Sequence, residues 1–131
     1  MSIVGIGIDV VDCARIESSI ERFGERFLHR VFTEGEIAYS QSMKFPARHF
    51  AARFAAKEAV SKAFGTGIGK AMGWRDIDVH NKESGEPFLV LQAGADRLAK
   101  SRDMKSSWIT LSHTDHHAIA MIVLEGSSRD L

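Results

Sequence analysis

The helix that the sequence predicts from Pro46 to Gly65 constrains the fold most strongly, because its two faces differ in kind. Its central stretch reads FAAKEAVSKAFG, and on a helical wheel small apolar residues fill one half: Ala52, Ala55, Ala56, Ala59, Val60 and Ala63. The other half mixes polar side chains with phenylalanines: Arg53, Lys57, Glu58, Ser61 and Lys62 among Phe50, Phe54 and Phe64. A helix face in water does not normally carry three phenylalanines among its charges. We therefore predict that the alanine half packs on the core and that the charged half faces a cleft or a second subunit.

Length and composition predict one folded domain. The chain has 131 residues, of which 44% are hydrophobic and 26% are charged, as in ordinary globular domains. We predict a single domain over residues 1–125 and a flexible tail over residues 126–131. The net charge is +0, from 17 basic and 17 acidic side chains. The chain as a whole therefore does not attract nucleic acid or an anionic membrane, and a local cluster must bind any anion.

The cysteine content and the hydropathy indicate a compartment. Cys13 is the single cysteine, which excludes an internal disulfide and a zinc site made of cysteines alone, and which favours the cytoplasm. No apolar run reaches the ~18–20 residues of a membrane-spanning helix. The N-terminal stretch MSIVGIGIDV lacks a basic region and carries Asp9 where the apolar part of a signal peptide would continue. We expect a cytoplasmic protein without a membrane anchor.

The first strand, predicted from Ile3 to Val11, has an unusual second face. Ile6 and Ile8 point to one face and alternate with Gly5 and Gly7, so the second face is bare backbone from Gly5 until Asp9. Another element can therefore approach the glycines closely, and Asp9 is exposed at the end of this gap.

The remaining signals predict alternating groups of helices and strands. Asp12 caps a helix that runs towards Arg30 with Gly24 as the candidate break, and Thr33 with Glu36 has the spacing of a capping box. The other predicted elements are a helix from there to Met43, the central helix, strands at Asp76–Asn81 and Phe88–Leu91, a helix at Ala93–Arg102, and strands at Trp108–Leu111 and Ala118–Leu124. This order predicts an α+β fold with a mixed, largely antiparallel sheet packed against a long central helix.

Two interpretations of the charges on the central helix remain open at this point. Glu58 and Lys62 have the spacing of an i,i+4 ion pair, which on an exposed helix stabilises by only ~0.2–0.5 kcal/mol. Alternatively, Glu58 binds a cation beside Lys57 and Lys62, which neutralise phosphate. Magnesium typically takes one or two protein carboxylates and completes its octahedron with phosphate and water. Asp9 is the candidate second carboxylate, although it lies 49 residues before Glu58 in the chain.

Several familiar motifs are incomplete. Gly5-Ile-Gly7 does not continue into a dinucleotide fingerprint, and the loop from Gly65 to Lys70 lacks the glycine and the Ser or Thr of a P-loop. The segment His113–His117 allows a zinc site, a solvated turn or an anion contact through His113. The arginine stripe fits either a solvated helix face or an acidic protein partner: Arg15, Arg22, Arg26 and Arg30.

Three blocks together resemble one family. GIGIDVVDCARI (residues 5–16), RFAAKEAVSKAFGTGIG (53–69) and LSHT (111–114) closely resemble, in order and spacing, the holo-[acyl-carrier-protein] synthases, the small single-unit type of 4′-phosphopantetheinyl transferase. The resemblance spans almost the whole chain. It implies a 4′-phosphopantetheinyl transferase-like fold, and transfer of phosphopantetheine from coenzyme A to a serine of apo acyl carrier protein, in support of fatty acid biosynthesis. It also implies a homotrimer with sites between subunits.

The resemblance also implies roles for individual residues. Asp9 and Glu58 match the magnesium carboxylates, and Lys62 matches a lysine that neutralises phosphate. The matches to coenzyme A contacts are Arg53, Ser61, Lys62, Gly65 and His113, with His113 near the 3′-phosphate. The matches to the carrier-protein surface are Arg15, with Arg26 and Arg30 beside it. We further expect Glu58 to act as general base through a water.

Two other functions remain open from the sequence. One is a binding module, in which the arginine stripe binds a protein and the Glu58 helix forms a subunit interface. The other is a metal-dependent hydrolase of nucleotide pyrophosphates. Asp115, His116 and His117 depart from any fixed family pattern and receive no predicted role.

Overall fold

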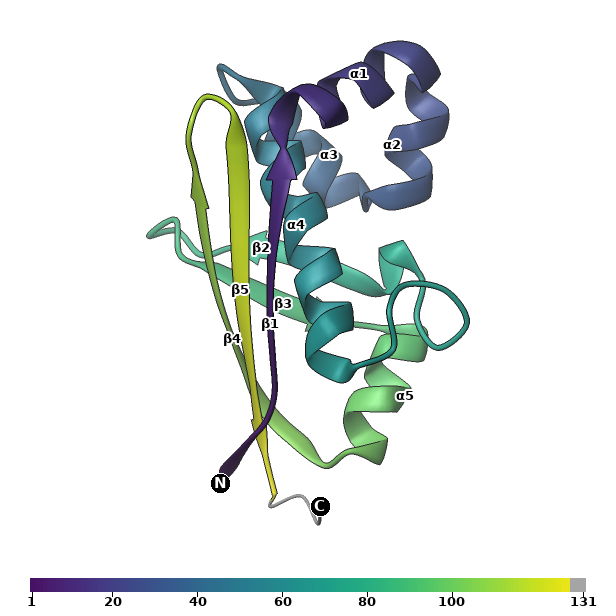
Figure 1. Ribbon diagram of the computed structural model, residues 1–131, viewed down its shortest axis with the longest axis vertical. Coiled ribbons are helices and arrows are strands. Elements are labelled where there is room, and N and C mark those ends of the chain that lie inside the picture. The colour runs from purple at the N-terminus through teal and green to yellow at the C-terminus, as the bar shows by residue number, and fades with distance from the viewer. Residues whose placement is uncertain (128–131) are drawn as a thin grey trace.

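The computed structural model describes residues 1–127 as one α+β unit (Figure 1). Its elements are β1 (Ser2–Asp12), α1 (Cys13–Phe23), α2 (Glu25–Val31), α3 (Glu34–Gln41), α4 (Pro46–Phe64), a 3-10 turn (Trp74–Asp76), β2 (Ile77–Asn81), β3 (Pro87–Leu91), α5 (Ala93–Ser101), β4 (Met104–His113) and β5 (His117–Gly126). The predicted order of helices and strands is confirmed.

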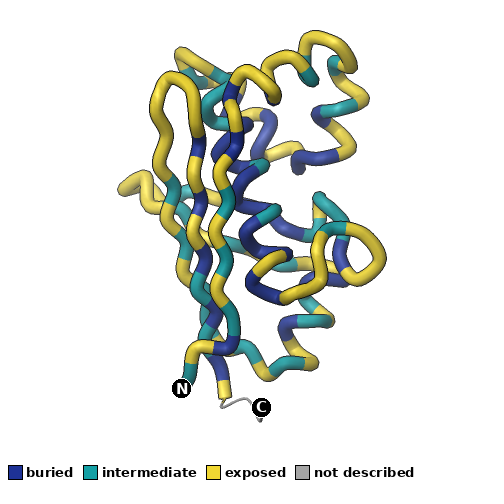
Figure 2. The backbone as a smooth tube through the Cα atoms, in the orientation of Figure 1, coloured by how far each residue is buried: buried dark blue, intermediate teal, exposed yellow. Residues whose placement is uncertain are grey.

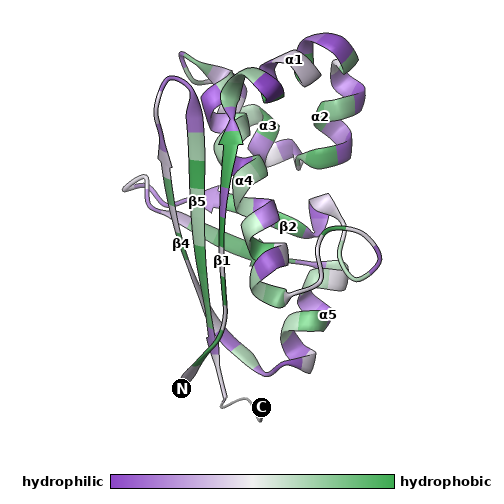
Figure 3. Cartoon of the chain, in the orientation of Figure 1, coloured by the Kyte–Doolittle hydropathy of each residue, from purple (hydrophilic) through white to green (hydrophobic). Residues whose placement is uncertain are grey.

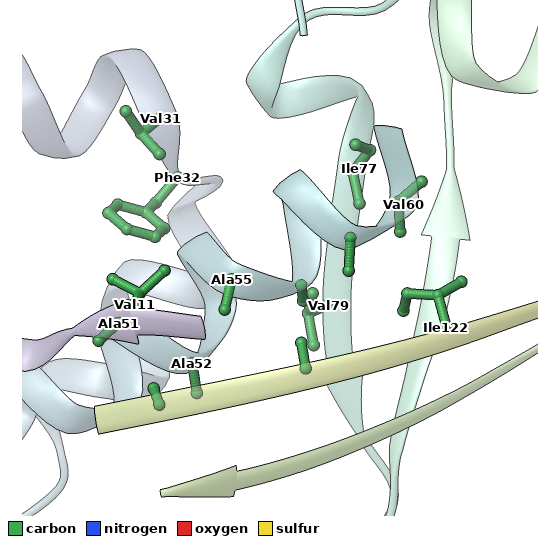
Figure 4. Packing of buried hydrophobic residues seen from close by; sticks show 14 of the residues in the cluster. Val11, Val31, Phe32, Ala51, Ala52, Ala55, Val60, Ile77, Val79 and Ile122 are labelled. Carbon is green, nitrogen blue, oxygen red and sulfur yellow. The ribbon is translucent and has the colours of Figure 1, made fainter. Parts of the chain in front are cut away.

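The strands form two antiparallel sheets instead of the single sheet that the sequence predicts. β1, β5 and β4 make a three-stranded sheet in that order, and β2 pairs with β3 in a separate hairpin. Figure 1 shows the hairpin passing behind α4, which lies against the three-stranded sheet. Val60 of α4, Ile77 and Val79 of β2 and Ile122 of β5 are all buried and gather in one core (Figure 4). Both sheets therefore share the long helix.

The glycine face of β1 lies against α4, as a bare backbone face allows. A Cβ atom added to Gly7 would lie 1.9 Å from the carbonyl oxygen of Ala59, and one added to Gly5 would lie 2.1 Å from that of Ala63. Ala59 is fully buried and Ala63 nearly so. The alanine half of α4 therefore packs on the core, and small residues on both elements bring Asp9 of β1 close to the helix.

Local signals set the ends of the helices as predicted. The Asp12 carboxylate accepts a hydrogen bond from Ala14 N and caps α1, and Gly24, with φ of 56°, separates α1 from α2. The Thr33–Glu36 capping box is present at the start of α3. α4 begins at Pro46 and ends before Gly65, whose φ of 76° is left-handed.

The three-stranded sheet has an exposed apolar face on the side away from α4. The side chains there are large and accessible: Ile6 (63%), Ile8 (57%), Val10 (57%), Trp108 (58%), Ile119 (36%) and Met121 (44%). Along β1 exposed and less exposed residues alternate in Figure 2, and Figure 3 shows much of β1 in the hydrophobic colour. We refer to these six residues as the apolar sheet face.

The C-terminal strand is longer than predicted. β5 includes Gly126, which pairs with Ser2 and Met104, although the sequence predicts that the tail starts there. Ser127 of the predicted tail is described and its amide donates to Asp103 O at 3.3 Å, whereas residues 128–131 lie outside the described residues. Within residues 1–127, no helix is both long enough and apolar enough to cross a membrane.

Candidate active site

Asp9 and Glu58 lie on the walls of one cleft of about 460 Å³. Asp9 comes from β1 and Glu58 from α4, two elements that the glycine face brings together. The cleft is lined by Asp9, Val10, Val11, Asp12, Arg15, Phe54, Glu58 and His117. Phe54 stacks on Trp74, with ring centroids 4.9 Å apart, and supplies an aromatic wall. The separation of 49 positions in the sequence thus does not keep the two carboxylates apart.

Lys62 lies beside Asp9 at this site. Its ammonium group donates hydrogen bonds to Asp9 Oδ1 at 2.8 Å and to the carbonyl oxygen of Ile8 at 3.1 Å. The Lys62 side chain is half exposed (53%), whereas that of Asp9 is mostly covered (16%). A cation on a flexible stem therefore remains open to an anionic ligand while it neutralises Asp9.

Glu58 lies in an environment that disfavours its charged form. Partial burial raises the pKa of the Glu58 carboxyl, and the negative charge of Asp9 raises it further, while Lys62 and Arg15 lower it. Asp9 and Glu58 line the same cleft, and like charges at such a site repel each other. An additional cation between them would relieve this repulsion.

The donor set fits a hard divalent cation. Among residues 1–127 no group of three or more His, Cys, Asp and Glu side chains could hold a metal. Asp9 and Glu58 are two carboxylates that line one cleft. This is the pattern in which magnesium binds together with substrate phosphates. The zinc site considered for His113–His117 gains no support within the described part of the chain.

Lys57 does not face the cleft, contrary to the expectation from the helical wheel. Its side chain is fully buried, and Nζ bonds Glu36 Oε1 at 2.8 Å, Trp74 O at 2.9 Å and Ile77 O at 2.5 Å. All the capacity of the ammonium group is thus used inside the core, which excludes Lys57 as a phosphate ligand in this state. Phe50 and Phe64 are likewise buried in the core instead of lining the Asp9–Glu58 cleft.

Arg53 and Ser61, two predicted coenzyme A contacts, also lie on the inner side of α4. Arg53 is 2% exposed; its guanidinium donates to Asn81 Oδ1 at 2.5 Å and lies 4.1 Å from the ring centroid of Tyr39. Ser61 is 1% exposed and donates to the Glu58 carbonyl oxygen at 2.7 Å. Neither lines the Asp9–Glu58 cleft. Their contacts with coenzyme A stay predictions.

Gly65 opens an exposed loop directly after α4. The amides of Thr66 and Gly67 donate to Ser61 O, at 3.1 and 3.4 Å, and so close the end of the helix. A guanidinium nitrogen of Arg102 also donates to the carbonyl oxygen of Phe64. The loop is therefore anchored at the end that adjoins Lys62.

His113 lies at the other edge of the three-stranded sheet. It ends β4, whereas Asp9 belongs to β1, and β5 separates the two strands. The ring of His113 contacts that of His49, with centroids 5.3 Å apart. Arg48 forms an ion pair of 2.9 Å with Asp115 beside them. Sequence reasoning missed Arg48 and His49, because only the fold brings the start of α4 to this hairpin.

The predicted carrier-protein arginines are all exposed but do not form one uniform face. Arg15 lines the Asp9–Glu58 cleft, and Arg26 and Arg30 project from α2. Arg22 lies between them with its guanidinium 5.3 Å from the ring centroid of Phe23, which is 52% exposed. Basic groups and an exposed aromatic ring thus lead away from the cleft along α1 and α2.

Comparison with known proteins gives the class of the chain. Residues 5–122 match the model of the 4′-phosphopantetheinyl transferase superfamily. This match covers β1, the α4 helix and the beginning of β5, and therefore all residues of the Asp9–Glu58 cleft.

Individual relatives define the family more narrowly. The holo-[acyl-carrier-protein] synthase of Koribacter versatilis is 43% identical to this chain over 94% of the chain and 98% of its own length. A crystal structure of the Bacillus anthracis synthase in complex with CoA (3′,5′-ADP) has a TM-score of 0.79 and 38% identity, and covers 95% of this chain and 98% of its own. The Helicobacter pylori synthase in complex with coenzyme A has a TM-score of 0.82 and 33% identity, with coverage of 92% and 99%.

The chain belongs to the holo-[acyl-carrier-protein] synthase family of this superfamily. It is therefore an enzyme of the phosphopantetheinyl transferase class, and the predicted α+β transferase fold is confirmed. The family assignment excludes a mere binding module as the main function.

Proposed function

We propose that this chain transfers 4′-phosphopantetheine from coenzyme A to a serine of apo acyl carrier protein and releases adenosine 3′,5′-bisphosphate. The observation that carries the proposal is the cleft lined by Asp9 and Glu58, with the ammonium group of Lys62 bonded to Asp9 beside it. Phosphoryl transfer mainly requires that charge is neutralised and that the reactants are aligned. Two carboxylates for a cation and one lysine for phosphate meet both requirements.

Asp9 and Glu58 would hold a magnesium ion in this cleft. When bound, magnesium would neutralise charge on the coenzyme A pyrophosphate and help to align it. Lys62 would contact the same phosphates, since its ammonium group is half exposed and already adjoins Asp9. The chain would thus supply negative carboxylates for the metal and a positive ammonium group for the pyrophosphate.

The nucleophile would come from the carrier protein. Its serine oxygen would bond to the phosphorus that carries pantetheine while the bond from that phosphorus to the departing adenosine 3′,5′-bisphosphate breaks. Glu58 would accept the serine proton through a water.

We further propose that coenzyme A contacts two copies of the chain in a homotrimer. Within one copy, Asp9 and Lys62 lie at the β1 edge of the sheet and His113 at the β4 edge. The β1 edge of one subunit and the β4 edge of the next would then form one site, with Lys62 and Gly65 on one side and Arg53 and His113 on the other. Ser61, whose hydroxyl donates to the Glu58 carbonyl oxygen, would also contact coenzyme A.

The apolar sheet face supports this assembly. Exposed side chains of β1, β5 and β4, such as Ile8, Met121 and Trp108, lie on neighbouring strands of one sheet, and large exposed apolar areas mark protein contacts. Association over this face would remove them from water. The cleft beside Lys62 that is lined by Ile6, Ile8 and Met121 continues from this face, so assembly and site formation would be linked.

The carrier protein would bind along α1 and α2. Arg15 adjoins the cleft, and Arg26 and Arg30 extend the basic surface. An acidic carrier protein would be guided by these charges so that its serine reaches Glu58. We propose a cytoplasmic enzyme that serves fatty acid biosynthesis, a location that the free Cys13 supports.

Mass spectrometry of apo acyl carrier protein before and after incubation with coenzyme A and magnesium tests the proposal. We expect a mass gain of one phosphopantetheine, loss of the gain in Asp9→Ala, and a decrease of about 10²–10⁴-fold in rate for Glu58→Gln. Near wild-type turnover of Glu58→Gln at saturating magnesium would contradict the assignment of the base. Release of adenosine 3′,5′-bisphosphate without a protein acceptor would instead indicate a hydrolase.

A further inference from the structure

A second group of basic side chains lies where the first turns of α4 meet the β4–β5 hairpin. His49 packs edge-on against His113 (centroids 5.3 Å apart, 71° between planes) and against Tyr39 (5.9 Å, 77°). Arg53 lies over the same Tyr39 ring. Burial lowers the pKa of His49, and the positive charges of His113, Arg53 and Arg48 lower it further. A guanidinium nitrogen of Arg53 also donates to the carbonyl oxygen of His49 at 3.5 Å, and Arg48 precedes His49 in the chain, so the four basic residues form one group.

The hairpin turn that carries His113 is attached on both sides. The hydroxyl oxygen of Thr114 accepts hydrogen bonds from the amides of His116 and His117, at 3.2 and 3.1 Å. Cys13 N donates to the His116 carbonyl oxygen at 2.8 Å, which attaches the turn to α1. The ion pair between Arg48 and Asp115 attaches it to α4. His113 itself is exposed at the end of β4, with the His49 ring as an aromatic support.

The two clusters of this chain differ in charge in a way that matches the two anionic groups of coenzyme A. The cleft cluster mixes Asp9 and Glu58 with Lys62 and suits a pyrophosphate that arrives with a divalent cation. In the second cluster Arg48 and Asp115 balance each other and Arg53 is buried, which leaves the exposed imidazole of His113 open to an anion. A basic side chain of this kind suits a phosphate monoester without a metal.

We propose that His49 is a positioning residue for His113, holding the imidazole edge-on so that it binds the 3′-phosphate of coenzyme A, with the Arg48–Asp115 pair fixing the turn. The inference rests on the proposed function, because it concerns one end of the same substrate. His49 acts through His113 and does not contact the reacting atoms. It therefore affects how tightly coenzyme A binds and leaves the transfer step unchanged.

Coenzyme A and 3′-dephospho-coenzyme A, compared as substrates, test this role. His49→Ala removes an aromatic pair, and such pairs contribute free energy equivalent to about two- to tenfold in binding. We expect the KM for coenzyme A to rise by about this factor, with kcat within about twofold of wild type. The KM for 3′-dephospho-coenzyme A should stay unchanged. His49→Phe keeps the ring and is the matched control, with both KM values close to wild type.

Asp115→Asn provides a second variant whose folding is not at risk, because the Asp115 side chain is 76% exposed. We expect it to raise the KM for coenzyme A by about two- to fivefold, as the loss of an exposed ion pair allows. The KM for 3′-dephospho-coenzyme A should again stay unchanged.

Three results would overturn the inference: equal KM increases for both substrates in His49→Ala, no increase for either, or wild-type protein that does not distinguish the two substrates. Calorimetric binding of coenzyme A and 3′-dephospho-coenzyme A to wild type, His49→Ala and His49→Phe, without carrier protein, separates this failure from that of the proposed function. If wild type transfers nothing but His49→Ala selectively loses affinity for coenzyme A, the role of His49 stands and the transferase proposal does not.

Discussion

Lys57 and Glu58 are neighbours in the chain and serve opposite purposes. Lys57 points into the core, where its Nζ lies 2.8 Å from Glu36 Oε1 and donates further hydrogen bonds to two carbonyl oxygens. Glu36 in turn accepts hydrogen bonds from Thr33 N and Val79 N at 2.9 and 2.8 Å. This buried pair connects α3, α4 and β2. It thereby fixes the rotation of α4 that turns Glu58 towards Asp9.

We predict that the Lys57–Glu36 pair is strongly coupled. Lys57→Met should lower the free energy of unfolding by about 3–5 kcal/mol, because it leaves the buried Glu36 charge without its partner. The double variant Lys57→Met/Glu36→Gln should lose less than the sum of the two single changes. Lys62→Met, on the same helix but half exposed, is the control and should cost under about 1 kcal/mol. Urea unfolding measures all four, and strict additivity would contradict the prediction.

The pKa of His49 predicts a pH dependence of stability. Burial and the positive charges of His113, Arg53 and Arg48 lower this pKa in the folded chain. The unfolded chain, with an ordinary histidine pKa of about 6.5, therefore binds the proton at higher pH. The stability that neutral His49 contributes is complete above about pH 6.5 and is lost as the pH falls towards the lowered folded-state pKa.

His49→Phe keeps the ring and removes this titration. Its free energy of unfolding should therefore fall less than that of wild type between about pH 7 and pH 5. Urea unfolding at several pH values checks the difference in slope. Parallel curves for the two proteins would show that His49 does not titrate differently in the folded and unfolded chains.

At the scale of elements, the contact between β1 and α4 builds the Asp9–Glu58 cleft. Gly7 is two residues before Asp9, and a Cβ atom there would meet backbone atoms of Ala59 and Ala63 at 1.9–3.0 Å. Backbone atoms of a buried helix cannot move aside cheaply. The strand would have to separate from the helix, and Asp9 would move away from Glu58.

We predict that Gly7→Ala lowers the free energy of unfolding by about 1–3 kcal/mol, as overpacking does, and lowers the transfer rate as well. Gly35→Ala is the matched control: it lies in α3 with nothing within 4 Å of the added atom, and alanine in a helix should stabilise by up to about 1 kcal/mol. Thermal unfolding and the transfer assay measure both variants. If Gly7→Ala were as stable as wild type, the close approach would not be needed.

The elements that the sequence predicts well are those with local causes. Asp12, Gly24, Thr33 and Gly65 end or begin helices through bonds and backbone angles within a few residues. Long-range pairing is different: nothing near Lys57 in sequence indicates that Glu36, 21 positions away, will meet it in the core. The wheel for α4 therefore separated small from large residues correctly but could not tell buried charges from cleft charges.

The same limit applies to the site. Family motifs led directly to Asp9, Glu58 and Lys62, which the fold brings together. His49 has no such motif, and its position beside His113 depends on how α4 crosses the sheet. The isoleucine face of β1 likewise has the alternation of an ordinary strand, and only the sheet order shows that it is left exposed.

For the whole molecule, the apolar sheet face predicts self-association. Ile8 lies within this face, next to Met121 on β5, and is 57% exposed. Ile8→Lys would place a charge in the contact, so the molar mass in light scattering should fall towards the 14.5 kDa of one chain. Val90→Lys is the matched control, because Val90 is a similar exposed strand residue (40%) outside this face. Circular dichroism should show both variants folded.

If two copies of the chain form each active site together, mixing two defective variants should restore part of the transfer activity. Asp9→Ala removes the cluster at the β1 edge, and His113→Ala weakens the cluster at the β4 edge. If each site combines these edges from two copies, mixed oligomers contain some sites in which both edges are intact. Transfer by the mixture, assayed with coenzyme A below its KM, should then exceed the mean of the two separate variants. Adding Ile8→Lys to both chains should abolish the gain, whereas a mixture equal to the mean would indicate that each copy holds a complete site.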